Sequence, residues 1–468
     1  MDYLKGIFLE KSFIASRKFT LHDQQQFAKF SGDLNPIHLS DEYARKTPPG
    51  RAIVHGINSL LWALDVFLIS GNDILDQLFV KFLQPIYLDE TVDCYYYPDT
   101  QLIEISNPEV VFLRLKLSGF RCADTNHMSY SKSMAQLELS DMDFSDIESL
   151  ENIEFTQSAD PSYVKDLYPG LFAGYGCSLV SQISYLSSVV GMQAPGLHSI
   201  FVSATLNLKK KNNVQSIEVI KTDQRFSLVD LRVNTADMEA KLRAIVRPMP
   251  IESLSLTALN KKITKRFAAG KRVLVIGGSR GLGSYTVKIL ALMGAAVTFS
   301  YARGVRDAER LKKELEDTGI NVNFVHFDVS EPNFCELFDS EPDYVFYFAT
   351  PKIFVKRSKV FEQELYSKFK LFYVDTFETI LEKCASGSAK GVFYPSSVAV
   401  VDETKALPEY IQAKLEGESL CKEYDNRDDL TVLVSRLPRT LTDQTATHLT
   451  IESEAPFDVL MPIFEELL

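Results

Sequence analysis

The stretch "INSLLWALDVFLIS", residues 57–70, decides the first part of the fold. Its apolar side chains cover nearly every face of a helix, and a helix without a polar face is typically buried. Three later segments, at 78–98, 110–122 and 130–139, are rich in β-branched and aromatic residues in rough alternation, which indicates long antiparallel strands. One buried helix wrapped by a curved sheet is the simplest assembly of these parts.

The same order of elements returns further along the chain. A second helix candidate, at 177–192, is followed by strand candidates at 195–210, 215–235 and 239–249. The repeat is one of pattern more than of residues. It suggests two related units packed side by side, because such packing hides sheet edges that would otherwise be exposed.

Beyond residue 269 the pattern changes to short apolar strands that alternate with helices. The strand candidates lie at 271–278, 295–302, 321–329, 343–349, 390–397 and 430–438. Such alternation is typical of a parallel, doubly wound sheet. An acidic stretch at 138–162 and a polar, basic stretch at 251–268 are interpreted as connectors. We therefore expect three domains, at 1–140, 155–252 and 269–468.

The composition excludes several classes of protein. Apolar residues make up 46% of the 468, yet no uninterrupted apolar stretch approaches the roughly 20 residues of a membrane helix. The net charge of −12 argues against nonspecific nucleic-acid binding. The six cysteines stand singly, which predicts reduced thiols and no metal site. Because the N-terminus lacks a secretory signal, we expect a cytoplasmic protein without membrane or nucleic-acid partners.

The loop "IGGSRGLG", residues 276–283, joins the first strand of the last domain to its first helix. Glycines there let the backbone approach a pyrophosphate, and the helix N-terminus offers free N–H groups and a partial positive charge. Arg280 in the loop and Arg303 after the second strand both suit a 2′-phosphate, which favours NADP(H) over NAD(H). Two solvated arginines are the alternative interpretation.

Tyr410 and Lys414 are one helical turn apart, so their side chains share one helix face. The adjacent ammonium is expected to favour the Tyr410 phenolate and to bring its pKa toward neutral pH. Such a pair can donate a proton to a substrate carbonyl oxygen. A chance surface pair of tyrosine and lysine is the alternative.

Residues 271–445 resemble the short-chain dehydrogenase/reductase family. The resemblance rests on the glycine spacing, on "HFDVS" (326–330), on Ser397 with "YIQAK" (410–414), and on "RLPRTLTDQT" (436–445). It implies a Rossmann fold with Ser397, Tyr410 and Lys414 as catalytic residues. The NADP(H)-binding residues that it implies are Gly277, Ser279, Arg280, Gly281, Gly283, Arg303, Asp328, Val329, Ala349, Lys414, Pro438 and Thr442.

The chain also departs from this family. Ile276 stands for the usual threonine, "YFAT" (347–350) for the usual N-N-A-G, and Arg439 for a glycine. The stretch 368–381 holds no asparagine, although the family's fourth catalytic residue is expected there, and Asp375 is the nearest polar substitute. An altered proton relay, with slow reduction or an unusual substrate, is therefore expected.

The stretch "SGDLNPIHLS", residues 31–40, is a second candidate site. Asp33 and His38 are separated by four residues across a proline turn and can converge on one water molecule. Asn35 would fix the loop or orient one of the pair, and the N–H of Gly56 would polarise a bound carbonyl group. An Asx-type turn that only caps the backbone is the alternative.

With Gly32, Pro36, Ala44 and the "VHG" at 54–56, this stretch resembles the MaoC-like, or (R)-specific enoyl-CoA hydratase, family over residues 20–95. The resemblance implies a hot-dog fold, an antiparallel sheet wrapped around a long helix, in which His55 is more often structural than catalytic. The second unit resembles a hot-dog that lacks a stretch like the one carrying Asp33 and His38. Its His198 is interpreted as a strand-end residue. The expected fold class is an α+β double hot-dog followed by an α/β Rossmann domain.

One hypothesis unites these sites. A dehydratase/hydratase that interconverts (R)-3-hydroxyacyl and trans-2-enoyl thioesters would be fused to an NADPH-dependent 3-ketoacyl thioester reductase. Its partners would be acyl-CoA or an acyl carrier protein, and the resemblances imply a homodimer. A hydratase with a degenerate, scaffolding reductase domain is one alternative, and a noncatalytic acyl-binding docking protein is another.

Overall fold

A computed structural model describes most of the chain. The described residues are 11–71, 73–121, 138–150, 153, 161–209, 212, 214–249, 251, 253–353, 361–401, 407–425, 429–442, 445 and 452–468. The chain divides into two compact units, of which the first runs to Met249 and the second begins with the next residue. Among the described helices, none combines the length and apolar character needed to cross a bilayer.

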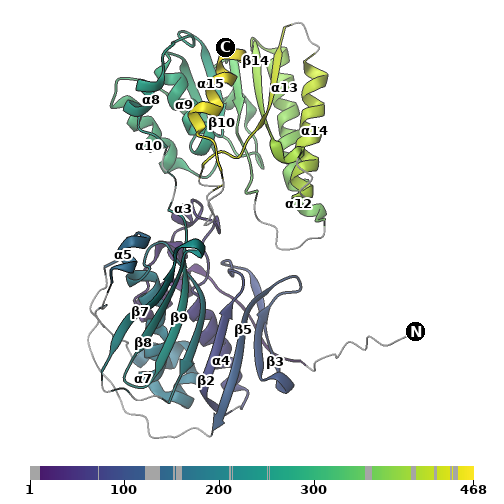
Figure 1. The fold of residues 1–468 in the computed structure, drawn as a ribbon. Coiled ribbons are helices and arrows are strands. Elements are labelled where there is room, and N and C mark those ends of the chain that lie inside the picture. Colours follow the sequence, from purple (N-terminus) through teal and green to yellow (C-terminus); the bar gives the residue numbers. More distant parts are fainter. Residues whose placement is uncertain are drawn as a thin grey trace. The chain divides into compact units, whose positions relative to one another are not determined.

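The first unit is built on a nine-stranded antiparallel sheet (Figure 1). Its strands are β1 (Ser12–Lys18), β2 (Ile74–Phe82), β3 (Thr91–Tyr97), β4 (Leu102–Ser106), β5 (Val111–Arg121), β6 (Ser199–Asn207), β7 (Ser216–Asp223), β8 (Leu228–Asn234) and β9 (Glu239–Val246). The expected strand at 130–139 falls almost wholly outside the described residues. Strands β1 and β4 were not predicted.

The order of the sheet shows two equivalent halves. The strands run β1-β3-β4-β5-β2-β6-β9-β8-β7, so β3-β4-β5-β2 is mirrored by β7-β8-β9-β6. The halves meet where β2 pairs with β6, from Gln77 opposite Asn207 to Lys81 opposite Ser203. This pairing satisfies two edges that would otherwise be open, as the repeated pattern predicted.

The first unit also contains α-helices and short 3-10 and π turns. They are α1 (Leu21–Ser31), α2 (Pro36–Leu39), α3 (Asp41–Ala44), α4 (Gly56–Ile69), α5 (Phe144–Glu148), α6 (Pro161–Leu167), α7 (Pro169–Ser188), the 3-10 turns Pro98–Thr100 and Gln224–Phe226, and the π turn Val189–Gln193. The predicted buried helix is α4, and its counterpart α7 packs directly against it (Figure 1). Leu60 and Leu64 of α4 share one core with Ile183 and Leu186 of α7. The two halves therefore form a double hot-dog around one hydrophobic core.

The second unit is a parallel six-stranded sheet with strand order β12-β11-β10-β13-β14-β15. Its strands are β10 (Arg272–Ile276), β11 (Ala296–Tyr301), β12 (Asn323–His326), β13 (Tyr344–Tyr347), β14 (Gly391–Ser397) and β15 (Thr431–Leu437). All six were predicted. Strands β10 to β12 follow one another toward one edge of the sheet, and strands β13 to β15 follow one another from β10 toward the other edge. Ligands of such sheets bind at the carboxyl ends of the strands where the order changes, here between β10 and β13.

Helices cover both faces of this sheet (Figure 1). They are α8 (Leu256–Lys262), α9 (Gly281–Leu292), α10 (Val305–Glu316), α11 (Phe334–Leu337), α12 (Gln363–Lys370), α13 (Thr376–Ser386), α14 (Pro408–Tyr424), α15 (Pro456–Leu467), the π turn Leu371–Asp375 and the 3-10 turn Val398–Val400. Side chains of β10 alternate between two cores, with Val273 and Val275 in one and Leu274 and Ile276 in the other. The connector expected at 251–268 contains α8, which packs on α9 as part of this unit.

Candidate active sites

Residues 32–35, called the reactive loop below, lie between two capped helices of the first unit. Helix α1 ends at Gly32, whose left-handed backbone (φ 77°) suits glycine. Helix α2 begins after Asn35, whose side-chain oxygen accepts a hydrogen bond from the Ile37 N–H, with Pro36 in the first turn. Both ends of the loop are thus fixed by local sequence, and Asp33 is held between them.

Asp33 is buried, with 2% of its surface exposed. Its Oδ2 accepts a hydrogen bond of 2.6 Å from the Ser187 hydroxyl, and its Oδ1 accepts one of 3.2 Å from the Asn35 N–H. Burial raises the pKa of Asp33, while the charge of His38 and these hydrogen bonds oppose that rise. A carboxyl group in this setting is suited to both accepting and returning a proton.

His38 faces Asp33 as the motif predicted. Its Nδ1 donates to the Ile53 carbonyl oxygen at 2.8 Å, which leaves the Nε2 lone pair available. Burial lowers the pKa of His38, although Asp33 raises it, so the neutral ring is favoured near neutral pH. His38 stacks on His55 with ring centres 3.8 Å apart.

His55 lies behind this pair. Its Nδ1 lies 2.9 Å from the Gln24 side-chain oxygen, its Nε2 lies 3.1 Å from the Asp33 carbonyl oxygen, and burial lowers its pKa. Ligand atoms of Asp33, His38 and His55 all lie within 4.8 Å of one another, so these three side chains are also close enough together to hold a metal ion. Because His55 is wholly buried, a structural role is the simpler interpretation.

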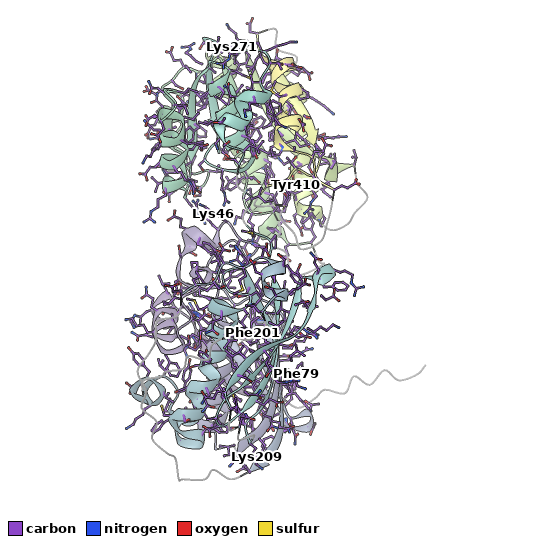
Figure 2. The ribbon with its side chains drawn as sticks, turned by 60° about the vertical axis from the view of Figure 1, so that its left-hand side comes forward. Lys46, Phe79, Phe201, Lys209, Lys271 and Tyr410 are labelled. Carbon is purple, nitrogen blue, oxygen red and sulfur yellow. The ribbon has the colours of Figure 1, made fainter. Side chains whose placement is uncertain are left out.

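A cavity of about 150 Å³ opens onto Asp33 and His38. Phe82 lines it from the first half, and Phe201, which Figure 2 labels, lines it from the second. Gly56 also lines it and begins α4, a helix without a side-chain cap, so its first N–H groups are not taken by a cap. The cavity is mainly apolar with a few polar groups, as expected of a site for an acyl chain.

The second half supplies residues that were not predicted from the sequence. Ser187 donates to Asp33, and a Cβ on Gly191 would lie 2.4 Å from Asp33 Oδ1. The Asn35 amide donates to the carbonyl oxygens of Gly191 at 2.9 Å and Leu197 at 3.2 Å. Asn35 therefore fixes the reactive loop to the second half, one of the two roles expected for it. The only hint in the sequence was a glycine in an otherwise helical, small-residue run.

His198 does not line the cavity. It directly precedes β6, and its Nε2 lies 3.0 Å from Asp141 Oδ1. This position agrees with the expectation of a strand-end residue.

In the second unit, the glycine loop lies at the carboxyl end of β10. A Cβ on Gly277 (φ 78°) would lie 2.8 Å from the Ala349 nitrogen, and one on Gly283 would lie 2.2 Å from the Gly277 oxygen. Only glycine fits these positions, and the turn brings the backbone to the first turn of α9, which begins at Gly281 after Arg280. Ser300 of β11, another unpredicted residue, accepts a hydrogen bond from the Gly277 N–H at 3.0 Å.

The remaining cofactor residues lie on neighbouring strand ends. Arg303 follows β11, is exposed, and helps to lower the pKa of Asp328, whose Oδ1 also accepts hydrogen bonds from Ser330. Val329 is buried beside Asp328, and Ser279 is half-buried within the glycine loop. The segment after β15 holds Pro438 and Thr442, both half-buried. Tight glycines, a helix N-terminus and nearby arginines fit a phosphorylated dinucleotide.

The serine, tyrosine and lysine come together as predicted. Tyr410 and Lys414 lie on the buried face of α14, and Ser397 at the end of β14 hydrogen-bonds the Tyr410 side chain. The expectation that Lys414 lowers the pKa of Tyr410 was wrong, because burial raises it to about 12. The Lys414 Nζ donates to the Pro395 carbonyl oxygen at 2.6 Å and lies 5.9 Å from the centre of the Tyr410 ring.

Asp375, the expected substitute for the missing asparagine, points elsewhere. Its carboxylate pairs with Lys370 and nearly half of its side chain is exposed. The residue that faces Lys414 from this segment is Tyr373, two positions earlier. The prediction of Asp375 was therefore wrong.

Each of the two units is similar to a known protein family. Residues 10–97 match the family model described as MaoC like domain, and residues 271–339 match the one described as short chain dehydrogenase. The chain thus carries a MaoC-like domain in its double hot-dog unit and a short-chain dehydrogenase domain in its Rossmann unit.

Particular relatives cover small parts of the chain. It is 43% identical over 44 residues to 3-hydroxybutyryl-CoA dehydratase of Methylorubrum extorquens, which is 9% of this chain and 28% of the relative. It is 33% identical over 75 residues to 5′-hydroxyaverantin dehydrogenase of Dothistroma septosporum, which is 16% of this chain and 24% of the relative. The chain therefore spans about a quarter of the length of each of these curated relatives.

Solved structures are similar to the chain at low identity. A short chain dehydrogenase from Burkholderia cenocepacia in complex with NADP is 19% identical, with a TM-score of 0.37 over 42% of this chain and 89% of that one. An alcohol dehydrogenase from Thermococcus sibiricus complexed with 5-hydroxy-NADP is 18% identical, with a TM-score of 0.36 over 42% of this chain and 91% of that one.

Proposed function

We propose that the chain is a bifunctional acyl-thioester enzyme. The first unit would interconvert (R)-3-hydroxyacyl and trans-2-enoyl thioesters, and the second would reduce 3-ketoacyl thioesters with NADPH. The observation that carries the proposal is the convergence of Asp33 and His38 on one buried cavity, in a chain that also brings Ser397, Tyr410 and Lys414 together.

In the hydration direction, the neutral His38 ring and the Asp33 carboxylate activate one water molecule at C3. Its hydroxyl bonds to C3, and a proton passes to C2, so that one water adds across the double bond. The N–H of Gly56 at the start of α4 stabilises the negative charge that develops on the thioester oxygen. Dehydration runs through the same groups in reverse.

In the reductase unit, bound NADPH supplies the hydride for the carbonyl carbon. Ser397 orients the substrate carbonyl oxygen, and the Tyr410 hydroxyl donates the proton to it. A Tyr410 pKa near 12 keeps that proton in place until charge develops on the oxygen. Arg280 and Arg303 would bind the 2′-phosphate, Asp328 and Val329 the adenine, and Lys414 the ribose side, with Gly277, Gly281 and Gly283 around the pyrophosphate.

The two activities share the (R)-3-hydroxyacyl thioester, which gives a chemical reason for their fusion. The carrier is coenzyme A or an acyl carrier protein. We also propose a cytoplasmic location and a homodimer. The location is supported by the free thiols of Cys94, Cys177, Cys335, Cys384 and Cys421, since reduced cysteines are usual in that compartment.

Single substitutions in the full chain test the two activities separately. Hydration of crotonyl-CoA and NADPH oxidation with acetoacetyl-CoA would be measured for Asp33→Asn and Tyr410→Phe. We expect Asp33→Asn to lose at least about 100-fold in hydration alone, and Tyr410→Phe to lose as much in reduction alone. A wild type without NADPH oxidation would leave only the hydratase, and one without hydration would refute the first assignment.

A further inference from the structure

The segment that lacks the family's asparagine has an unusual backbone. Helix α12 passes into a π turn, Leu371–Asp375, before α13 begins. A π turn adds one residue to a helical turn and changes which side chains face inward, and such turns are frequent at functional sites. Here it places Tyr373, with 1% of its surface exposed, on the inner face.

Lys414 lies in a box of aromatic rings. Its Nζ is 3.8 Å from the centre of the Tyr373 ring, 4.8 Å from that of Tyr394 and 5.9 Å from that of Tyr410. Tyr373 is the nearest of the three, at a distance typical of a strong interaction between a cation and a ring face. Lys414 itself is buried, with 5% of its surface exposed.

The nearest acid does not pair directly with this ammonium. Glu418, one turn further along α14, accepts two hydrogen bonds from Arg436, at 2.9 and 2.7 Å, and one of 2.5 Å from Ser396. The Lys414 Nζ instead donates to a neutral acceptor, the Pro395 carbonyl oxygen. The faces of the Tyr373 and Tyr394 rings are therefore among the groups closest to the buried ammonium.

The Tyr373 ring is held firmly in this position. Its hydroxyl lies 2.5 Å from the Thr350 hydroxyl, and its carbonyl oxygen accepts a hydrogen bond of 3.2 Å from the Tyr394 hydroxyl. Its ring also meets that of Tyr410 edge to face at 5.6 Å. Tyr373 thus touches two members of the proposed catalytic group at once.

We propose that Tyr373 is a positioning residue of the reductase site, whose ring face holds the Lys414 ammonium where the family would have an asparagine and a hydrogen-bonded relay. This inference rests on the proposed reductase function. It explains how the site keeps its lysine in place without that asparagine. It also assigns a role to Thr350, in the "YFAT" departure, as the residue that anchors the Tyr373 hydroxyl.

The titration of Lys414 tests the inference without requiring turnover. Burial lowers the pKa of Lys414 to about 7, while Cys421 and Glu418 oppose that shift. The groups that face the amine are Tyr373 from the π turn, Tyr394 from β14, and Tyr410, Glu418 and Cys421 from its own helix. The pH midpoint would be read from acetic anhydride labelling of the full chain, by mass spectrometry of the Lys414 peptide.

Tyr373→Leu keeps an apolar side chain but removes the ring, so the midpoint should fall by roughly one to one and a half pH units. Tyr373→Phe keeps the ring and should leave the midpoint unchanged. Phe369→Leu is the matched control, because its ring contacts those of Tyr373 and Tyr410. If Tyr373→Leu does not fold, Tyr373→Met replaces it.

An unchanged midpoint in Tyr373→Leu or Tyr373→Met, or an equal shift in Phe369→Leu, would overturn the inference. A lower midpoint in Tyr373→Leu, with unchanged midpoints in Tyr373→Phe and Phe369→Leu, would support the inference even if the wild type oxidised no NADPH. The absence of NADPH oxidation would refute only the reductase proposal. If the wild type is active, the same variants should move the pH profile of NADPH oxidation in parallel.

Discussion

Gly191 is the position where the second half of the double hot-dog comes closest to Asp33. A methyl group added there would lie 2.4 Å from Asp33 Oδ1 and 2.7 Å from its Cγ and Oδ2. Ordinary contacts to such atoms exceed 3.4 Å. Gly191→Ala must therefore displace the carboxylate or the π turn by about 1 Å.

Asp33 cannot retreat without losing its partners. Ser187 holds Oδ2 at 2.6 Å, the Asn35 N–H holds Oδ1 at 3.2 Å, and His55 Nε2 lies 3.9 Å from Oδ2. A misplacement of about 1 Å in a catalytic group can cost about 100-fold in rate. We expect that loss in kcat/KM for hydration, with a destabilisation of about 1–3 kcal/mol from overpacking.

The assay is hydration of crotonyl-CoA by the full chain, with NADPH binding as a measure of the intact second unit. Gly174→Ala is the matched control on α7, because its added methyl would lie 2.8 Å from Ile74 Cγ2 and far from the reactive loop. If the Gly191→Ala variant folds and hydrates crotonyl-CoA at the wild-type rate, the reasoning is refuted. An equal loss of hydration in Gly174→Ala would also refute it, because overpacking alone would then explain the result.

Two further predictions concern side chains with defined partners. Ser187→Ala removes a hydrogen bond that lowers the pKa of Asp33, so the acidic limb of the hydration pH profile should move to higher pH. Ser188→Ala, which loses only a bond to the Tyr185 carbonyl, should leave that limb in place, and equal profiles for both would contradict the prediction. Arg303→Ala should raise the Kd for NADPH by about 10-fold to 100-fold, as expected for one charge-assisted hydrogen bond, while the Kd for NADH changes little. Fluorescence titration would measure both constants, and equal changes would show that Arg303 does not contact the 2′-phosphate.

The sequence was sufficient to predict the arrangement of residues that lie close together in the chain. Asp33 lies in a short loop and His38 in the helix α2 that directly follows it, and the caps on both sides are fixed by neighbouring residues. Tyr410 and Lys414 lie one helical turn apart on α14. All six strands of the parallel sheet were also found, because each is a short apolar run between helices. Geometry of this kind follows from spacing along the chain.

The parts that were missed depend on distant or irregular structure. Ser187 lies 154 residues from Asp33, so only the pairing of the two halves brings them together. In the sequence, Asp375 is the nearest polar residue to the position of the missing asparagine, and no local pattern reveals that a π turn places Tyr373 inward instead. The pKa of Tyr410 was misjudged because burial outweighs the neighbouring charge once the side chain is enclosed.

The pairing of β2 with β6 has a consequence for how the proposed hydratase site is maintained. A site shared between two separate subunits falls apart on dilution, whereas this one is tied together by a single polypeptide at any concentration. Each chain then needs only one reactive loop, so the other half is released from carrying an aspartate and a histidine of its own. Mutations can accumulate there as long as Ser187, Gly191 and the carbonyl partners of Asn35 stay in place.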